Sequence, residues 1–188
     1  MAKKTQRIYQ IRVTLNGSKP PIWRELAVPF HIVLGELHEV IQVAMGWEDC
    51  HMHQFRKGKE YYVTKVTPWG MPVEIEGEDE EDFTLGEVCP KARSKLLYEY
   101  DFGDGWAHTI EAQKRIEPEP GVKYPVCLGG EKACPPEDCG GMWGYSEMLD
   151  VLADPDADDP NDMREWIGDE FDPDAFDLDA VNAILATW

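Results

Sequence analysis

The segment of residues 96–110 constrains the fold more than any other part of the sequence. It reads LLYEYDFGDGWAHTI, and aromatic or apolar residues alternate with polar ones on both sides of its Gly-Asp-Gly triplet. An alternation with period two is typical of a strand that is buried on one face. Because glycine and aspartate favour turns, the triplet at 103–105 predicts a β-hairpin whose two strands lie against a core.

The length of the hairpin loop decides which side chains share a face, because a change of one residue moves one whole strand to the other side. A two-residue loop would pair Asp101 with His108, but it would mix acidic and aromatic side chains on one face. A three-residue loop collects the apolar and aromatic side chains on a single face: Leu96, Tyr98, Tyr100, Phe102, Trp106, His108 and Ile110. We therefore predict that Phe102 lies opposite Trp106, that Trp106 is buried, and that Asp101 lies on the polar face.

Other stretches predict an opening pair of strands, one amphipathic helix and a second hairpin. Alternating apolar residues indicate strands over 8–15 and 22–29, and the helical spacing of apolar residues over 33–45 ends at Gly46. The segments HMHQF and YYV, joined by a short loop with a glycine, predict the second hairpin. The run of carboxylates over 76–82 is interpreted as a solvated loop, because neighbouring like charges repel.

The last third of the sequence predicts a long loop followed by helices. Residues 117–141 are rich in proline and glycine, which favours an ordered loop without strand pairing. Helical patterns follow over 145–152, 160–167 and 178–187. The expected fold class is α+β: a mixed, mainly antiparallel sheet with one early amphipathic helix and a helical C-terminal third. A length of 188 residues fits a single domain over residues 1–188.

The charge of the chain limits its partners. With 37 acidic and 18 basic residues the formal net charge is -19, which repels phosphate backbones, so duplex nucleic acid is not an expected partner. The sequence contains neither an apolar signal segment nor a run of about 18 apolar residues, so we expect a cytoplasmic protein that does not cross a membrane. Five cysteines, an odd number, favour free thiols or metal ligands over a disulfide framework.

Several long motifs in a fixed order resemble one family. They are PPIWRELAVP, LHEVIQVAMGW, HMHQF, YEYDFGDGWAHTI, CPPEDCGG and WIGDEFDPDAFDLDAVN, and together they span nearly the whole chain. The chain thereby resembles the Ri-plasmid open-reading-frame-three-like family of plasmids and mobile elements, some of whose members carry a resolvase-like label. The resemblance implies a compact α+β domain with a mixed sheet and assigns no reaction. Strand exchange requires a basic DNA-binding surface around its nucleophile, which this sequence lacks.

Histidines supply the first candidate site. His51 and His53 are two residues apart, so on a strand both imidazoles project from the same face and can reach one divalent metal ion such as zinc. His108, on the aromatic face of the first hairpin, would add a third nitrogen, and His38 a fourth. The alternative is that the two neighbouring histidines only pack beside Phe55 and bind the backbone.

A second candidate site is a recognition surface made by the hairpin turn and the CPPEDCGG loop. Its residues are Asp101, Asp104, Cys134, Asp138 and Cys139. The two cysteines are either zinc ligands or small buried side chains, and the absence of a paired C-x-x-C motif in the sequence favours the second interpretation. If the loop covers the hairpin, Glu137 and Asp138 place carboxylates beside His108.

These observations leave three functions open. The first is a cytoplasmic binding or accessory module for an unidentified ligand or protein. The second is a metal-dependent hydrolase in which His51, His53 and His108 hold a divalent ion and a carboxylate such as Asp138 acts as the base. The third, a DNA-processing accessory protein of mobile elements, depends on the resemblance alone and is opposed by the net charge.

Overall fold

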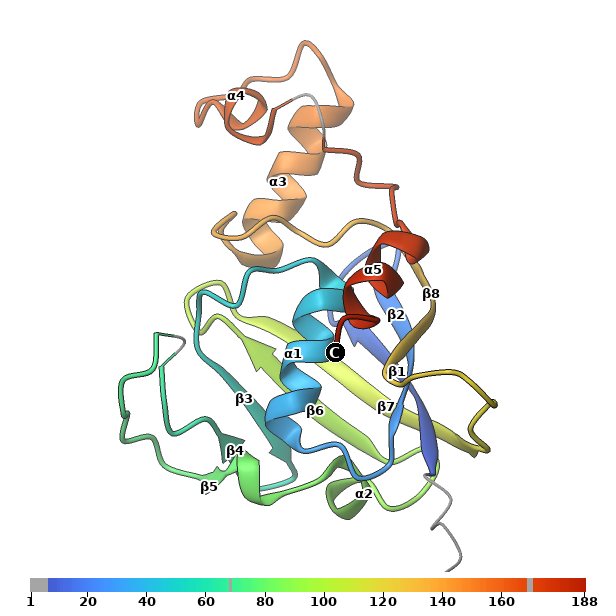
Figure 1. The fold of residues 1–188 in the computed structure, drawn as a ribbon. Coiled ribbons are helices and arrows are strands. Elements are labelled where there is room, and N and C mark those ends of the chain that lie inside the picture. The colour runs from blue at the N-terminus through green and yellow to red at the C-terminus, as the bar shows by residue number, and fades with distance from the viewer. Residues whose placement is uncertain (1–6, 68, 169–170) are drawn as a thin grey trace, which may run out of the picture.

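The computed structural model describes residues 7–67, 69–168 and 171–188. Its strands are β1 (Ile8–Leu15), β2 (Trp23–Pro29), β3 (His53–Lys57), β4 (Glu60–Val63), β5 (Glu78–Asp79), β6 (Lys95–Tyr100), β7 (Trp106–Ile116) and β8 (Val126–Glu131). Within the described ranges they form one sheet with the order β5-β4-β3-β6-β7-β1-β2-β8 (Figure 1). Neighbouring strands are antiparallel, except for β4 and β5, which are parallel.

The helices are short and lie mostly on one side of the sheet. They are α1 (Leu34–Met45), the 3-10 helix η1 (Glu80–Asp82), α2 (Leu85–Val88), α3 (Gly141–Ala153), α4 (Met163–Ile167) and α5 (Leu178–Leu185). In Figure 1, α1 crosses one face of the sheet with α5 beside it, while α3 and α4 extend from one end. Among the described residues, none of these helices is long and apolar enough to cross a membrane.

The core lies between α1 and the sheet face that it covers. The alternation predicted for the first strand is confirmed, because every second side chain of β1 is buried: Tyr9, Ile11, Val13 and Leu15. The helix predicted over 33–45 is also confirmed. Its apolar stripe faces the sheet, and Gly46 ends it with a φ of 94°, the left-handed conformation that favours glycine at this position.

The expectation of a helical C-terminal third is wrong. The helices after residue 140 are short, and residues 126–131 form β8, which pairs with β2, so 117–141 does not lack strand pairing either. Backbone hydrogen bonds hold an edge strand, and here β2 offers the free backbone groups with which this glycine-containing segment pairs. At Gly130 a Cβ would lie only 2.8 Å from the side chains of Arg24 and Phe176, so this strand needs glycine there.

The aromatic face of the hairpin formed by β6 and β7 is confirmed, but the predicted register is wrong by two residues. Tyr100 lies opposite Trp106, so the loop runs from 101 to 105, and Phe102 is 46% exposed in that loop. A shift of two residues keeps the same side chains on the same face. The aromatic side chains that remain on this face are fully buried: Tyr98, Tyr100, Trp106 and His108.

Asp101 does not lie on the polar face of the hairpin, as the alternation predicted. It follows β6 with a left-handed backbone, φ 55°, and its side chain is only 9% exposed. Its Oδ1 atom accepts a hydrogen bond of 2.9 Å from the N–H of Gly103, and its carbonyl oxygen accepts one of 2.6 Å from Gly105. Because aspartate closes such turns with its own side chain, the loop is longer than three residues.

The acidic segment 76–82 is not simply a solvated loop. Glu78–Asp79 form β5, and Glu80 is 3% exposed. The Glu80 carboxylate bonds to Nε2 of His53 through both oxygens, at 3.0 and 2.9 Å. A buried carboxylate needs such a partner, and here the partner comes from β3.

Candidate metal centre

Four polar side chains from three separate segments converge at one end of the sheet. His51 precedes β3, Asp101 begins the turn between β6 and β7, and the adjacent Glu137 and Asp138 lie in the loop before α3 (Figure 1). The Nε2 atom of His51 lies 3.2 Å from Oδ1 of Asp138. The other two carboxylates are also close to Nε2, with Oδ2 of Asp101 at 3.7 Å and Oε2 of Glu137 at 3.9 Å. We call these four residues the His51 cluster.

The backbone and neighbouring hydrogen bonds fix the three carboxylates. Asp101 and Asp138 both adopt the left-handed conformation, with φ of 55° and 57°, which is uncommon for a residue other than glycine. Glu137 is held through Oε1, which accepts hydrogen bonds of 3.0 Å from the hydroxyl of Tyr100 and from the backbone N–H of Glu48. Its second oxygen, Oε2, is therefore free to face the centre of the cluster.

Two atoms of the cluster are buried without a hydrogen-bond partner in the part of the chain that the structure describes. They are Oε2 of Glu137 and Nε2 of His51, whose 3.2 Å approach to Oδ1 of Asp138 is an ion-pair contact without hydrogen-bond geometry. A buried polar atom without a partner costs about 1–3 kcal/mol, so such atoms are uncommon in native proteins. Since an imidazole nitrogen and a carboxylate oxygen both offer lone pairs, one cation between them would satisfy both.

The spacing of the cluster fits metal coordination. Two ligand atoms that each lie about 2.1 Å from one ion are about 3.0 Å apart at a right angle and about 3.4 Å apart at a tetrahedral angle. The separations from His51 Nε2 are 3.2 to 3.9 Å. The ligand atoms of His51, Asp101 and Asp138 all lie within 4.8 Å of one another, and Glu137 forms a second such group with His51 and Cys50. One imidazole with carboxylates suits divalent zinc, manganese or iron.

The carboxylates also act on the ionisable groups around them. Burial raises the pKa of the Cys139 thiol to about 12, with further contributions from Asp104, Asp138 and Glu137. Burial, followed by Glu137, raises the pKa of the Tyr100 hydroxyl above its ordinary value. Both groups therefore keep their protons at neutral pH and add no negative charge of their own to the site.

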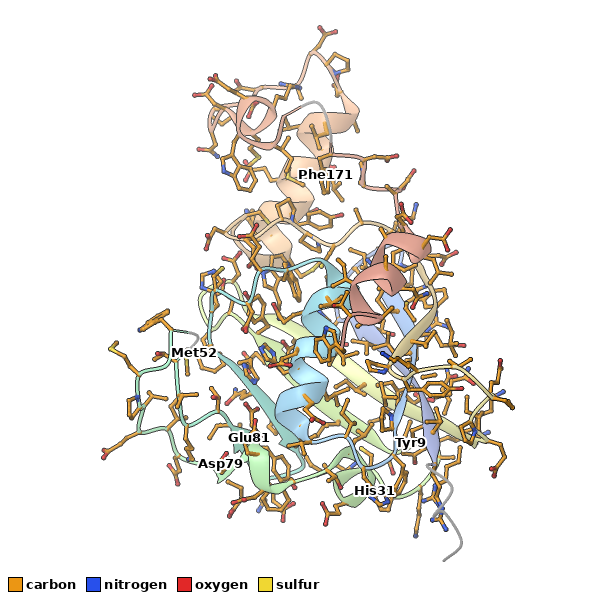
Figure 2. The ribbon with its side chains drawn as sticks, in the orientation of Figure 1. Tyr9, His31, Met52, Asp79, Glu81 and Phe171 are labelled. Atoms are coloured by element: carbon orange, nitrogen blue, oxygen red, sulfur yellow. The ribbon has the colours of Figure 1, made fainter. Side chains whose placement is uncertain are left out.

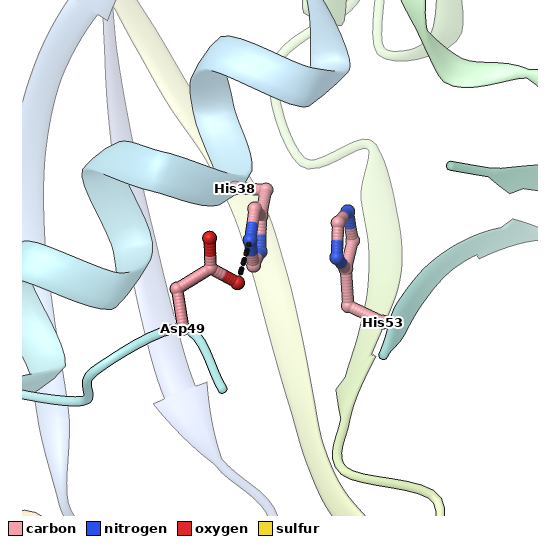
Figure 3. Close-up of side chains that lie close together, drawn as sticks. All are labelled: His38, Asp49 and His53. Atoms are coloured by element: carbon pink, nitrogen blue, oxygen red, sulfur yellow. Dashed lines mark hydrogen bonds and ion pairs between the residues drawn. The ribbon is translucent and has the colours of Figure 1, made fainter. Parts of the chain in front are cut away.

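A pair of stacked histidines joins α1 to the first residue of β3. The imidazoles of His38 and His53 are parallel within 5°, with ring centroids 3.4 Å apart (Figure 3). His38 bonds through Nε2 to Oδ1 of Asp49 at 2.9 Å and through Nδ1 to the hydroxyl of Tyr98 at 2.8 Å. His53 bonds through Nε2 to Glu80. We call His38 and His53 the stacked pair.

The stacked pair is poorly arranged for a shared metal ion. Ligand atoms of His38, Asp49 and His53 lie within 4.8 Å of one another. However, a ring nitrogen binds a metal in the plane of its ring, and the lone pairs of two parallel rings 3.4 Å apart lie in planes that do not meet. Burial lowers the pKa of His38, so this ring is neutral at neutral pH and the stack avoids repulsion between two cations.

Comparison with known proteins identifies the family. A family model described as plasmid pRiA4b ORF-3-like protein matches residues 7–180. The chain belongs to this family. The uncharacterized protein y4hQ of Sinorhizobium fredii is 35% identical over 190 residues, which cover 96% of this chain and 94% of that protein. The crystal structure of a protein of unknown function from Methanosarcina mazei Go1 is similar with a TM-score of 0.76 and 35% identity, covering 94% of this chain and 98% of that one.

Membership of the plasmid pRiA4b ORF-3-like family confirms the resemblance that the motifs indicated, and it leaves the activity to be argued from the site. The structure does not bring His51, His53 and His108 together. His51 joins Asp101 and Asp138, and His53 stacks on a different histidine. His108 belongs to neither group in the described residues.

The remaining residues of the expected recognition surface hold the loop in place. Oδ2 of Asp104 accepts a hydrogen bond of 3.1 Å from the N–H of Gly140, which joins the hairpin turn to the CPPEDCGG loop. Cys134 and Cys139 are free thiols that pack against the hydrophobic core. The loop therefore does cover the hairpin, as considered from the sequence, but its carboxylates meet His51 rather than His108.

The environment of His108 predicts a pH-dependent stability. The ring is fully buried, and burial lowers its pKa to about 3. A histidine of the unfolded chain titrates near pH 6.5, so between these values the unfolded state binds a proton that the folded state excludes. Stability is therefore lost as the pH falls from about 6.5 towards 3, by about 1.4 kcal/mol per pH unit from this group.

The variant His108→Leu is expected to remove this contribution, which urea unfolding at pH 6 and pH 5 measures as a smaller pH slope than in the wild type. The matched control is His31→Leu, which makes the same substitution at a histidine that is exposed at the lower edge of the molecule (Figure 2). An equal slope for the wild type and His108→Leu would show that the ring is protonated in the folded protein.

Proposed function

We propose that this member of the plasmid pRiA4b ORF-3-like family is a binding module that holds one divalent metal ion in the His51 cluster. The observation that carries the proposal is the pair of buried atoms without partners, Nε2 of His51 and Oε2 of Glu137. Both atoms lie among three carboxylates, which attract a cation and would repel one another without it. The left-handed backbone of Asp101 and Asp138 adds support, because such conformations collect at ligand sites.

Metal titration tests this proposal. Protein purified without an affinity tag is stripped with a chelator and titrated calorimetrically with zinc and manganese, and elemental analysis then counts the bound ions. We expect about one ion per chain, and His51→Ala is expected to weaken binding by about 100-fold, because it removes the single nitrogen ligand. A wild-type protein that binds neither metal would overturn the proposal.

Two isosteric variants separate loss of a ligand from loss of the fold. Glu137→Gln keeps an oxygen for the hydrogen bonds from Tyr100 and Glu48, and Asp101→Asn keeps one for Gly103. Both variants are expected to bind the metal more weakly and to have the same free energy of unfolding as the wild type. His53→Gln is the discriminating control: the histidine-pair hypothesis requires loss of the metal, whereas the His51 cluster predicts full retention.

A metal-dependent hydrolase is the second candidate, and the exposure of Asp138 favours it. Its side chain is 72% exposed while that of Asp101 is 9% exposed, so solvent reaches the cluster at Asp138. In this candidate function the other residues of the cluster would hold the ion, and Asp138 would not be a ligand but the general base that activates a water. In the metal-loaded protein, Asp138→Asn should then slow hydrolysis of 4-nitrophenyl acetate or 4-nitrophenyl phosphate without releasing the metal. Equal rates of hydrolysis by the wild type and Asp138→Asn would contradict the hydrolase and favour the binding module.

A role on duplex DNA has the least support of the three functions. A net charge of -19 opposes the release of counterions that drives binding to a phosphate backbone. We therefore propose that the protein does not bind duplex nucleic acid. Its cytoplasmic location is a separate proposal. Retention of a duplex in a gel shift at micromolar protein and about 150 mM salt would contradict the first proposal.

A further inference from the structure

A small open cavity lies between α3, α4 and the loop that precedes α3, at the end of the molecule where these helices extend from the sheet (Figure 1). Its volume is about 160 Å³. Two residues of its wall come from the loop, one from α3 and the others from α4 and the residues before it. They are Asp138, Cys139, Met148, Asn161, Met163 and Trp166.

Most of this wall is apolar. Met148 is buried in the core, and Met163 packs against the core from α4. Cys139 keeps its proton at neutral pH, as described above, and a neutral thiol behaves as a small apolar group. Trp166 is 53% exposed although it lines the cavity. Its indole ring therefore leaves apolar surface in water, which a group bound in the cavity would cover.

The size and the side chains of the cavity favour one aromatic ring. An apolar cavity of about 150 Å³ in a protein core is large enough to hold one benzene molecule. An indole ring stacks on other aromatic rings, and the sulfur atoms of methionine contact aromatic rings favourably. A wall with one tryptophan and two methionines offers both kinds of contact. An aliphatic group of the same volume would make neither.

The charge at the cavity favours an uncharged ring. Among the described residues, the wall contains one carboxylate, that of Asp138, and neither lysine nor arginine. The Asp138 side chain is 72% exposed, so it stands where a ligand enters from solvent. An aromatic anion such as benzoate would meet this negative charge without a cation of the wall to compensate it.

Asp138 also joins the cavity to the His51 cluster. Its Oδ1 atom lies 3.2 Å from Nε2 of His51, while the same residue forms part of the cavity wall. The two sites are thus separated by no more than one side chain. We propose that this cavity is the specificity pocket of the His51 cluster, and that it takes the uncharged aromatic ring of a small ligand whose metal-binding group reaches the ion. The inference rests on the proposed metal function, but the binding of the ring is testable without the metal.

Titration of the metal-free full chain with benzyl alcohol, followed by NMR, tests the cavity by itself. The methyl signals of Met148 and Met163 are expected to shift, because the ring current of a bound aromatic ring acts on nearby methyl groups. Trp166→Ala is expected to weaken binding by about tenfold, since the ring loses its stacking partner. This variant should fold, because α4 has no buried residue. The matched control is Trp143→Ala, since Trp143 is 83% exposed and is not among the described residues of the wall.

The outcomes of this titration decide the inference whatever the metal titration gives. Shifts of the two methionine signals that are lost in Trp166→Ala and kept in Trp143→Ala would support it. Unchanged methionine signals, or equal weakening by both tryptophan variants, would overturn it. Benzoate is expected to bind more weakly than benzyl alcohol, and tighter binding of benzoate would contradict the uncharged ring.

The zinc-loaded protein tests the connection to the ion. Acetohydroxamic acid and phenylacetohydroxamic acid carry the same metal-binding group, and only the second carries a ring. We expect the second to bind about tenfold more tightly, and Trp166→Ala to remove this preference without changing the affinity for zinc. Equal affinities of the two acids with zinc bound would overturn the inference and leave the proposed function intact. A chain that binds benzyl alcohol but not zinc would overturn the proposed function, and with it the assignment of the cavity to a metal ligand.

Discussion

Trp106→Ala is expected to lower the free energy of unfolding by about 3–5 kcal/mol, as large aromatic deletions in a packed core do. The ring of Trp106 is fully buried on the aromatic face of the hairpin, and its centroid lies 6.0 Å from that of Trp47. Trp47 in turn donates a hydrogen bond of 3.0 Å to the carbonyl oxygen of Pro135, in the loop that carries Glu137 and Asp138. The deletion therefore removes core contacts of Trp47, which anchors the loop that carries two residues of the His51 cluster.

Urea unfolding measures the effect, and the chain supplies a control of the same residue type. Trp143 is 83% exposed, so Trp143→Ala is expected to change stability by no more than about 0.5 kcal/mol. Trp106→Phe should cost less than the alanine variant, because the indole N–H is buried without a partner in the described part of the chain and its removal leaves nothing unsatisfied. A loss below about 1 kcal/mol for Trp106→Ala would contradict the packing described here.

The sequence predicts those parts of the fold that depend on local periodicity. Side chains of a strand alternate by geometry alone, so the buried faces of the first strand and of the aromatic hairpin follow from the sequence. The same holds for α1, whose apolar stripe repeats with the period of a helix and ends at Gly46. These predictions need only the neighbours along the chain.

Features that depend on distant partners were not predictable in the same way. The register of the β6–β7 hairpin differs from the predicted one because the side chain of Asp101 closes its own turn. The alternation of apolar and polar residues does not reveal such a turn. The strand β8 forms because β2 offers a free edge, although its own glycines suggest a loop. The sequence predicts Glu80 as part of a solvated acidic loop, because only the fold places His53 beside it.

The candidate metal site shows the same limit. All four of its residues were named from the sequence: His51 as a metal ligand, Asp101 and Asp138 as parts of a recognition surface, and Glu137 as a carboxylate that the loop would place beside His108. Their grouping was assigned to other partners, since nothing local indicates that the CPPEDCGG loop folds over the hairpin turn. The hydrogen bond from Gly140 to Asp104 joins these two segments, and it is a contact between residues far apart in the chain.

Replacement of Arg24 by methionine is expected to cost about 3–5 kcal/mol of stability, the second large effect. The side chain is 2% exposed, yet it donates four hydrogen bonds of 2.7 to 3.0 Å to backbone carbonyl oxygens, those of Ala44, Trp23, Glu131 and Lys132. These oxygens belong to the end of α1, to β2 and to the end of β8. Its guanidinium also lies 4.2 Å from the ring centroid of Phe176. One side chain thus joins the helix to the edge of the sheet, and methionine keeps the volume but leaves the carbonyl groups without donors.

Arg24→Lys separates the geometry of the guanidinium from its charge. A lysine ammonium is a single point donor that does not reproduce the fork of a guanidinium, so we expect it to lose at least about 2 kcal/mol although the charge is retained. The control is Arg56→Met, since Arg56 is exposed on β3, and its unfolding free energy should stay within about 0.5 kcal/mol of the wild type. Hydrogen exchange gives a local readout. In both Arg24 variants the exchange rate of the β8 amides should rise more than that of the amides in the rest of the sheet. If Arg24→Lys unfolded like the wild type, the charge alone would explain the stability, and the four carbonyl contacts would contribute nothing measurable.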